Sequence, residues 1–191
     1  MANTTEQQIK ERPILFSGEM VRAILEGRKT QTRRVVNPQP DDSGLWNDDK
    51  YPRSIISDLS GWNGTVDATG ESRQFKCPYG KPGDRLWVRE TWNRFGEIIY
   101  YKADEEKPFS YSTLWKPSIF MPRSASRILL EITDIRVERL HDISADDEKK
   151  EGIYSPIHEL LFWALWQKIN GPESWDANPW VWVITFKKII P

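Results

Sequence analysis

The chain has 191 residues, of which 38% are apolar and 29% charged, a balance that fits one folded domain with a packed core and argues against wholesale disorder. Lysine and arginine total 27 against 28 aspartates and glutamates, so the net charge is −1. That balance excludes a globally basic nucleic-acid binder, and any nucleic-acid partner would need a local patch of cations.

The composition also bears on cell compartment and on metals. No apolar run approaches the roughly 18 residues of a membrane span, and the polar residues 1–10 carry no signal-peptide core. The single cysteine, Cys77, excludes an internal disulfide and fits a reducing compartment. With only two histidines beside it, a structural zinc site is not expected. We therefore predict a cytoplasmic protein with no metal, no cofactor and no membrane partner.

Tryptophan is unusually frequent, with ten residues. Large aromatic side chains either fill a core or stack on bases. Four tryptophans follow helix or strand periodicity, which favours the core: Trp163, Trp166, Trp180 and Trp182. Four others lie in or beside irregular segments and are better candidates for ligand contact: Trp46, Trp62, Trp92 and Trp115.

The N-terminal part predicts one helix, a turn and a strand. Apolar residues recur on one face of residues 17–26, Ser17 can cap this helix, and Gly27 suits the left-handed residue that ends it. Residues 28–36 then indicate a turn that enters a strand. Residues 37–80 have few aliphatic side chains, and we interpret them as a long insertion with one hairpin, signalled by Asn63-Gly64.

The second half predicts more strands than helices. Strands are expected at 85–89, 97–102 and 124–140, the last with a break at Thr133-Asp134, and a final strand at 179–188. A short acidic helix at 144–151 is capped by Ser144 and ends at Gly152, and a longer helix spans 155–170.

This order of elements predicts an α+β fold around a mostly antiparallel sheet or small barrel, with a few flanking helices. We expect a single domain over residues 12–191, with 37–80 as an insertion and 1–11 as a flexible segment.

Two oppositely charged segments lie far apart in the sequence. Residues 22–34 hold five lysines or arginines and one glutamate, whereas residues 142–151 hold five acids and two lysines. The simplest interpretation is two solvated faces that attract each other weakly.

The sequence does not support a phosphate-binding loop or a cysteine nucleophile. Gly27-Arg28-Lys29-Thr30 lacks the glycine directly before the lysine and the glycine at position 23 that a phosphate-binding loop requires. Cys77 precedes a proline in a turn, where a surface or packing thiol is expected rather than a nucleophile.

Two motifs carry a resemblance to a known family. The run from Ile24 to Arg34, Ile-Leu-Glu-Gly-Arg-Lys-Thr-Gln-Thr-Arg-Arg, and Gly83-Asp84-Arg85-Leu86-Trp87-Val88 resemble the signature of the ASCH domain. The resemblance extends to residues 137–153 and to the final strand, and it skips the insertion. It implies a β-barrel similar to the PUA RNA-binding fold. The tryptophan-rich form with Cys-Pro-Tyr-Gly-Lys-Pro-Gly-Asp is similar to phage and prophage proteins.

One ASCH class hydrolyses N4-acetylcytidine to cytidine and acetate. The resemblance implies that Lys29 is the proton acceptor, Thr32 the nucleophile and Glu151 the proton donor. An amide needs such a nucleophile, a base to activate it and an acid for the leaving amine. Burial and neighbouring cations would lower the pKa of Lys29, whereas an ion pair with Glu151 would raise it, and the sequence leaves this competition open.

The same interpretation assigns the substrate contacts to the basic segment, residues 22–34, and to the insertion, residues 37–80. Arg28, Arg33 and Arg34 are expected to contact substrate phosphates, and Trp46 and Trp62 are expected to stack on a base. The expected partner is a nucleoside or a short RNA. A binding module without catalysis and a ribonuclease remain as alternatives. The enzyme interpretation requires Lys29, Thr32 and Glu151 to line one concave site, with Glu151 within about 10 Å of Lys29.

Overall fold

The computed structural model describes residues 8–37, 39, 54–57, 63–66, 72–74, 77–104, 114–153 and 158–189. The elements are, in chain order, β1 (Glu11–Leu15), α1 (Gly18–Leu25), β2 (Gln31–Val35), β3 (Ser54–Ser57), β4 (Asn63–Val66), β5 (Ser72–Gln74), β6 (Arg85–Arg89), β7 (Trp92–Phe95), β8 (Ile98–Tyr101), η1 (Lys102–Asp104), η2 (Ser118–Phe120), η3 (Arg123–Ala125), β9 (Leu129–Arg139), η4 (Leu140–Asp142), α2 (Ala145–Lys150), α3 (His158–Asn170) and β10 (Trp180–Ile189). The fold is α+β, as predicted. Among the described residues, no helix has the length and apolar character that crossing a membrane requires.

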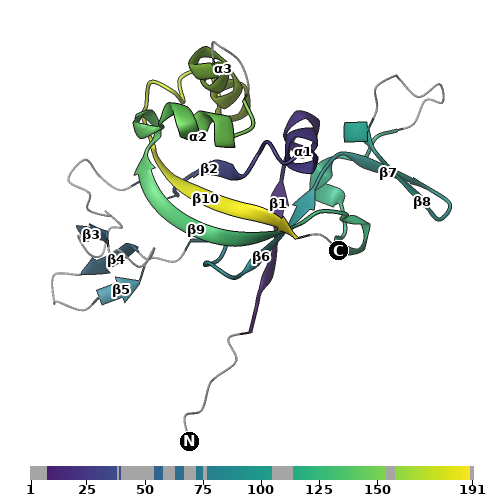
Figure 1. The fold of residues 1–191 in the computed structure, drawn as a ribbon, viewed down its shortest axis with the longest axis horizontal. Coiled ribbons are helices and arrows are strands. Elements are labelled where there is room, and N and C mark those ends of the chain that lie inside the picture. The colour runs from purple at the N-terminus through teal and green to yellow at the C-terminus, as the bar shows by residue number, and fades with distance from the viewer. Residues whose placement is uncertain are drawn as a thin grey trace, which may run out of the picture.

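The main sheet has five strands in the order β1-β6-β9-β10-β2. Only β1 and β6 pair in parallel, and the other neighbours are antiparallel. The long paired strands β9 and β10 curve strongly (Figure 1). Their register shifts between Thr185 and Phe186, because Thr185 pairs with Asp134 and Phe186 pairs with Ile132. Thr133 is therefore an extra residue, and the predicted break at Thr133-Asp134 is a β-bulge within one strand.

The core lies between this sheet and α1. Leu86, Leu130 and Ile184 from three strands are fully buried, and α1 adds Val21 and Ile24. The hydroxyl oxygen of Ser17 accepts a hydrogen bond from the backbone N–H of Met20, which caps α1 as predicted. Helix α1 thus fixes where the chain enters the segment with Lys29.

Within its described residues the insertion holds three antiparallel strands, β3-β4-β5, rather than the single predicted hairpin. The prediction that Asn63-Gly64 forms the turn is wrong, because Asn63 pairs with Ser57, and Gly64 pairs with both Ile56 and Gln74. A residue with ladder partners on both sides lies within a sheet, not at its turn. At the end of the segment, Cys77 and Tyr79 pack against the main core.

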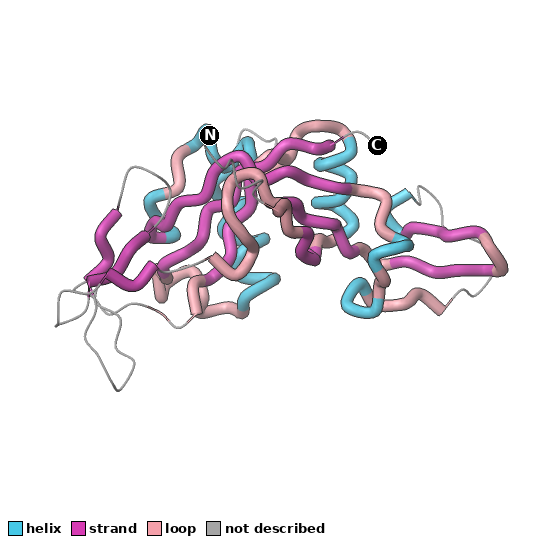
Figure 2. The backbone as a smooth tube through the Cα atoms, turned by 90° about the horizontal axis from the view of Figure 1, so that it is seen from below, coloured by secondary structure: helices cyan, strands magenta, loops and turns pink. Residues whose placement is uncertain are grey.

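A β-hairpin formed by β7 and β8 extends away from the main sheet (Figure 1 and Figure 2). Strand β8 agrees with the predicted strand at 97–102, and β7 was not predicted. Trp92 at the start of β7 is buried against Met121 and Ala125. Its interpretation as a ligand contact is therefore wrong, since packing already covers the ring. Trp46, Trp62 and residues 1–7 lie outside the described residues.

Candidate active site

The turn after α1 brings Lys29 toward the end of α2. Gly27 adopts φ +76°, and the backbone N–H groups of Arg28 and Lys29 both donate to the carbonyl of Ala23, at 2.9 and 3.0 Å. These bonds end the helix as Gly27 predicts and turn the chain. Lys29 then forms an isolated antiparallel bridge with Glu151, and the N–H of Thr30 donates to the carbonyl of Lys150 at 2.8 Å.

Helix α2 presents Glu151 at its C-terminal end. The hydroxyl of Ser144 caps the helix by accepting from the N–H of Asp147, and Gly152 follows with φ +91°. A Cβ atom on Gly152 would lie 3.0 Å from the Cβ of Ala23 and 3.1 Å from the Cβ of Lys29. The absence of a side chain at Gly152 is what lets the two segments approach closely.

Lys29 and Glu151 form a buried ion pair at this junction. Nζ of Lys29 lies 2.5 Å from Oε2 of Glu151 and donates to its backbone carbonyl at 2.9 Å. The side chains are 0% and 4% exposed. Burial lowers the pKa of Lys29 below its ordinary value, and the charge and hydrogen bond of Glu151 oppose that shift without cancelling it. The competition that the sequence left open is thus decided in favour of desolvation.

Arg33 holds the other oxygen of Glu151 and is saturated by protein groups. Its NH1 donates to Oε1 of Glu151 at 3.2 Å and to Gln31 at 2.9 Å. Its Nε and NH2 both donate to Oε1 of Glu138, and NH2 also donates to Asp147. A guanidinium has five N–H donors, so each has a partner. With a side chain only 1% exposed, Arg33 positions Glu151 and has no N–H left for the predicted phosphate contact.

Two further cations, Arg136 and Lys150, contact carboxylates that also bind Arg33. Arg136 donates to Oδ2 of Asp147 at 2.5 Å and to Glu138 at 3.0 Å, and Lys150 donates to Asp147 at 3.1 Å. Burial raises the pKa of Asp147, but the contacts with Lys150, Arg136 and Arg33 outweigh it, and the net pKa lies below the ordinary value. The interpretation as two weakly attracting solvated faces is therefore wrong, because α2 buries the pairs against β2.

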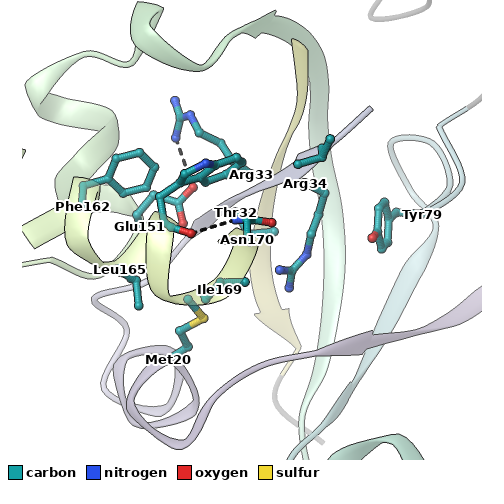
Figure 3. Close-up of a pocket in the computed structure, with 12 residues that line it drawn as sticks. Met20, Thr32, Arg33, Arg34, Tyr79, Glu151, Phe162, Leu165, Ile169 and Asn170 are labelled. Carbon is teal, nitrogen blue, oxygen red and sulfur yellow. Dashed lines mark hydrogen bonds and ion pairs between the residues drawn. The ribbon is translucent and has the colours of Figure 1, made fainter. Parts of the chain in front are cut away.

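Thr32 lies on the wall of a pocket beside this network. It pairs with Ile184 of β10, and the pocket has a volume of about 250 Å³. Figure 3 shows Glu151 and Phe162 on one side of the pocket and Arg34 and Tyr79 on the other. Thr32 and Glu151 thus share one concave site. The expectation that Lys29 also lines this site is wrong, because its side chain is wholly buried and contacts the site through Glu151.

The two remaining arginines of the basic segment differ in position. NH2 of Arg34 donates to the backbone carbonyl of Leu15 at 2.6 Å, yet Arg34 also lines the pocket. Arg28 donates to the carbonyl of Gly152 at 3.1 Å and pairs with Glu26. Arg34 is therefore the arginine best placed to meet a ligand, and Arg28 holds the turn on α2.

Sequence reasoning missed most of the pocket wall. Its unpredicted residues come from α1, from β2, from the end of the insertion and mainly from α3: Met20, Val35, Tyr79, Phe162, Leu165, Trp166, Ile169 and Asn170. Helical periodicity indicated only core positions for Trp163 and Trp166, which is confirmed for the buried Trp166 and wrong for Trp163, which is 41% exposed. Tyr79, within Cys-Pro-Tyr-Gly, was the one signal in the sequence, because its motif belongs to the resemblance.

Comparison of the chain with protein-family models, with curated proteins and with solved structures finds no match. Within the described ranges, no group of three or more histidine, cysteine, aspartate or glutamate side chains is arranged to hold a metal ion.

Proposed function

We propose that this protein is an amidohydrolase that removes the acyl group from an N4-acylated cytidine. The observation that carries the proposal is the buried contact between Lys29 and Glu151 at 2.5 Å, next to a pocket whose wall contains Glu151 and Thr32. A base, a hydroxyl and an acid are the three groups that amide hydrolysis by a covalent route requires.

In the first step the hydroxyl oxygen of Thr32 attacks the acyl carbon, and the proton leaves to the amine of Lys29. An ordinary lysine is protonated at neutral pH, so it cannot accept this proton. Burial lowers the pKa of Lys29, which increases the fraction of neutral amine. In this account Lys29 and Glu151 act as one unit, because the proton that the amine gives up can reside on the carboxylate 2.5 Å away.

In the second step the carbon–nitrogen bond breaks. The N4 nitrogen leaves with the bonding electrons and takes the proton held by Glu151, which yields cytidine and an ester on Thr32. Water then attacks the ester carbon and gives a proton to the carboxylate of Glu151. The oxygen of Thr32 leaves with the bonding electrons and takes the proton held by Lys29, and the acid is released. Arg33, bound to Oε1 of Glu151 at 3.2 Å, keeps the carboxyl group oriented through both steps.

The pocket suits a flat, polar ring. Its volume of about 250 Å³ lies just below the range of about 300–1,000 Å³ that is typical of drug-sized ligands. Tyr79 is half-buried and offers an aromatic face. Asn170 offers its amide oxygen and one N–H, because its side-chain nitrogen also donates to the carbonyl of Trp166 at 3.1 Å. These groups support recognition of a nucleobase, which combines a stacking surface with a hydrogen-bonding edge.

We also propose that the sheet is a PUA-like barrel of the ASCH type. The edge strands of the described sheet are β1 and β2. Arg34 of β2 donates to the carbonyl of Leu15 at the end of β1, and its guanidinium lies 5.2 Å from the ring centre of Phe16. One side chain therefore joins the two edges, which supports a sheet that curls toward closure.

A binding module without catalysis is the second candidate. The observation that favours it is that Lys29 has a 0% exposed side chain whose ammonium already contacts Glu151 twice. Such a pair can be purely structural. In that case the pocket would hold a modified base, with Arg34 and the aromatic residues as its contacts.

The two functions are distinguished by incubating the wild type with N4-acetylcytidine and measuring release of cytidine and acetate. Thr32→Val removes the hydroxyl with little change in volume, and Thr133→Val, at an exposed position of the bulge, is the matched control. Hydrolysis by the wild type and Thr133→Val, but not by Thr32→Val, supports the enzyme. Binding of the nucleoside without hydrolysis supports the binding module and contradicts the enzyme.

A further inference from the structure

A second cavity lies beside the candidate active site and shares part of its α3 wall. It has a volume of about 530 Å³ and is formed by the start of α1, by η1 and by α3. Its charged lining residues are Arg22, Lys102 and Lys168, together with Glu19. Neither the proposed reaction nor the resemblance uses this cavity.

The charge of this cavity is unbalanced toward cations. Arg22 is held by a hydrogen bond to the carbonyl of Ala103 at 3.1 Å. Lys102 and Lys168 are exposed, and no ion pair satisfies either of them in the described part of the chain. Two other exposed lysines do form ion pairs, Lys149 with Asp146 and Lys187 with Glu131. Three cations against one carboxylate leave a local excess of positive charge that favours an anion.

The two cavities share a wall. Leu165 and Ile169, one turn apart on α3, line both of them. The apolar ridge formed by Leu165 and Ile169 thus separates a pocket with aromatic and amide groups from a cavity with three cations. A ligand with a ring at one end and an anionic group at the other could lie across this ridge.

We propose that the cavity lined by Arg22, Lys102 and Lys168 binds a phosphate group of the same substrate whose base enters the first pocket. This inference rests on the proposed function and narrows its substrate class from a free nucleoside to a phosphorylated one. The phosphate belongs either to a nucleotide or to the backbone of a single strand. Lysine and arginine are the side chains that contact phosphate oxygens in both.

The experiment compares binding of three ligands: N4-acetylcytidine, its 5′-monophosphate, and a short single-stranded RNA with one N4-acetylcytidine. The test variant is Lys102→Gln/Lys168→Gln. The matched control is Lys149→Gln/Lys187→Gln, which removes the same charge from exposed lysines that line neither cavity.

The wild type and the control are expected to prefer a phosphorylated ligand over the nucleoside. In the test variant the ratio of the affinities for phosphorylated ligand and nucleoside is expected to fall about five- to tenfold, because each exposed charge pair contributes little. The affinity for the nucleoside itself is expected to stay unchanged. Preference for the monophosphate identifies a nucleotide as the source, and preference for the RNA alone identifies a strand. With RNA, the log–log salt slope of the test variant should be shallower by about 0.7 for each phosphate that the variant no longer neutralises.

Equal affinity of the wild type for nucleoside and phosphorylated ligands overturns the phosphate site, as does a preference that Lys102→Gln/Lys168→Gln leaves intact. The same titrations with cytidine and cytidine 5′-monophosphate separate this result from failure of the proposed function. If no acylated ligand is hydrolysed but the phosphate preference depends on Lys102 and Lys168, the phosphate site stands and the amidohydrolase falls.

Discussion

Nζ of Lys29 and Oε2 of Glu151 lie 2.5 Å apart, although 122 positions separate the two residues in the sequence. Lys29 follows the turn that ends α1, and Glu151 ends α2. Both side chains are removed from solvent, so their charges interact in a medium that screens them far less than water does. The pair therefore connects the ends of two helices beside the candidate site.

The pKa of Lys29 itself can be measured. Burial lowers it and Glu151 raises it, so Glu151→Gln is expected to lower the pKa of Lys29 further. The measurement is a titration of the labelled lysine amine by NMR, with Lys29→Met identifying the signal. A pKa for Lys29 at or above that of a free lysine would contradict the account, as would a Glu151→Gln variant in which the pKa rises.

Glutamine substitutions at Arg33 and Arg136 compare how much a buried and an exposed arginine of the same network contribute to the free energy of unfolding. Arg33→Gln leaves the buried carboxylates of Asp147 and Glu151 and the half-buried carboxylate of Glu138 without their shared partner. A loss of about 3–5 kcal/mol of unfolding free energy is expected. Arg136→Gln removes a side chain that is 38% exposed, with an expected loss below about 1 kcal/mol. Urea denaturation compares the two. Equal losses would contradict the finding that Arg33 organises the network.

The same network makes stability depend on pH. The net pKa of Asp147 is lowered, so its contribution is present above its unfolded pKa of about 3.9 and is lost as pH falls through the lower folded value. Asp147→Asn should therefore reduce Tm at neutral pH and narrow the difference from the wild type at acidic pH. If the difference stayed constant down to acidic pH, the charge of Asp147 would not be what stabilises the fold.

Alanine substitutions at Gly152 and Gly171 distinguish the effect of backbone strain from the effect of displacing Lys29. Both have positive φ, so alanine at either is expected to reduce stability by roughly 1–2 kcal/mol. A Cβ on Gly171 meets nothing within 4 Å, whereas one on Gly152 lies 3.1 Å from the Cβ of Lys29. Only Gly152→Ala should also slow hydrolysis, by at least about tenfold, because small misplacements of catalytic groups are costly. Equal activity in the two variants would show that the position of Lys29 does not matter.

Local signals in the sequence predicted the ends of the helices that carry the site. Ser17 and Ser144 cap α1 and α2, and Gly27 and Gly152 follow those helices with positive φ. Such features depend on a few neighbouring residues, so one sequence suffices to find them.

Long-range packing was harder to predict from the sequence than these local features. The parallel pairing of β1 with β6 and the bulge at Thr133 depend on partners more than fifty residues away. The saturation of Arg33 depends on carboxylates that come from distant elements, Glu138 of β9 and Asp147 of α2. The charge pattern alone therefore indicated a phosphate contact. The pairing of Lys29 with Glu151 was expected only through the resemblance, because the charged segments offered many alternative partners.

The most direct test of the account is the rate of N4-acetylcytidine hydrolysis by the wild type and by Lys29→Met, with Tm and circular dichroism recorded to verify that the variant folds. General bases typically contribute about 10²–10⁴ to a rate, so a folded Lys29→Met variant should be slower by at least about 100-fold. Hydrolysis at the wild-type rate in Lys29→Met would remove Lys29 from the mechanism and contradict the central claim.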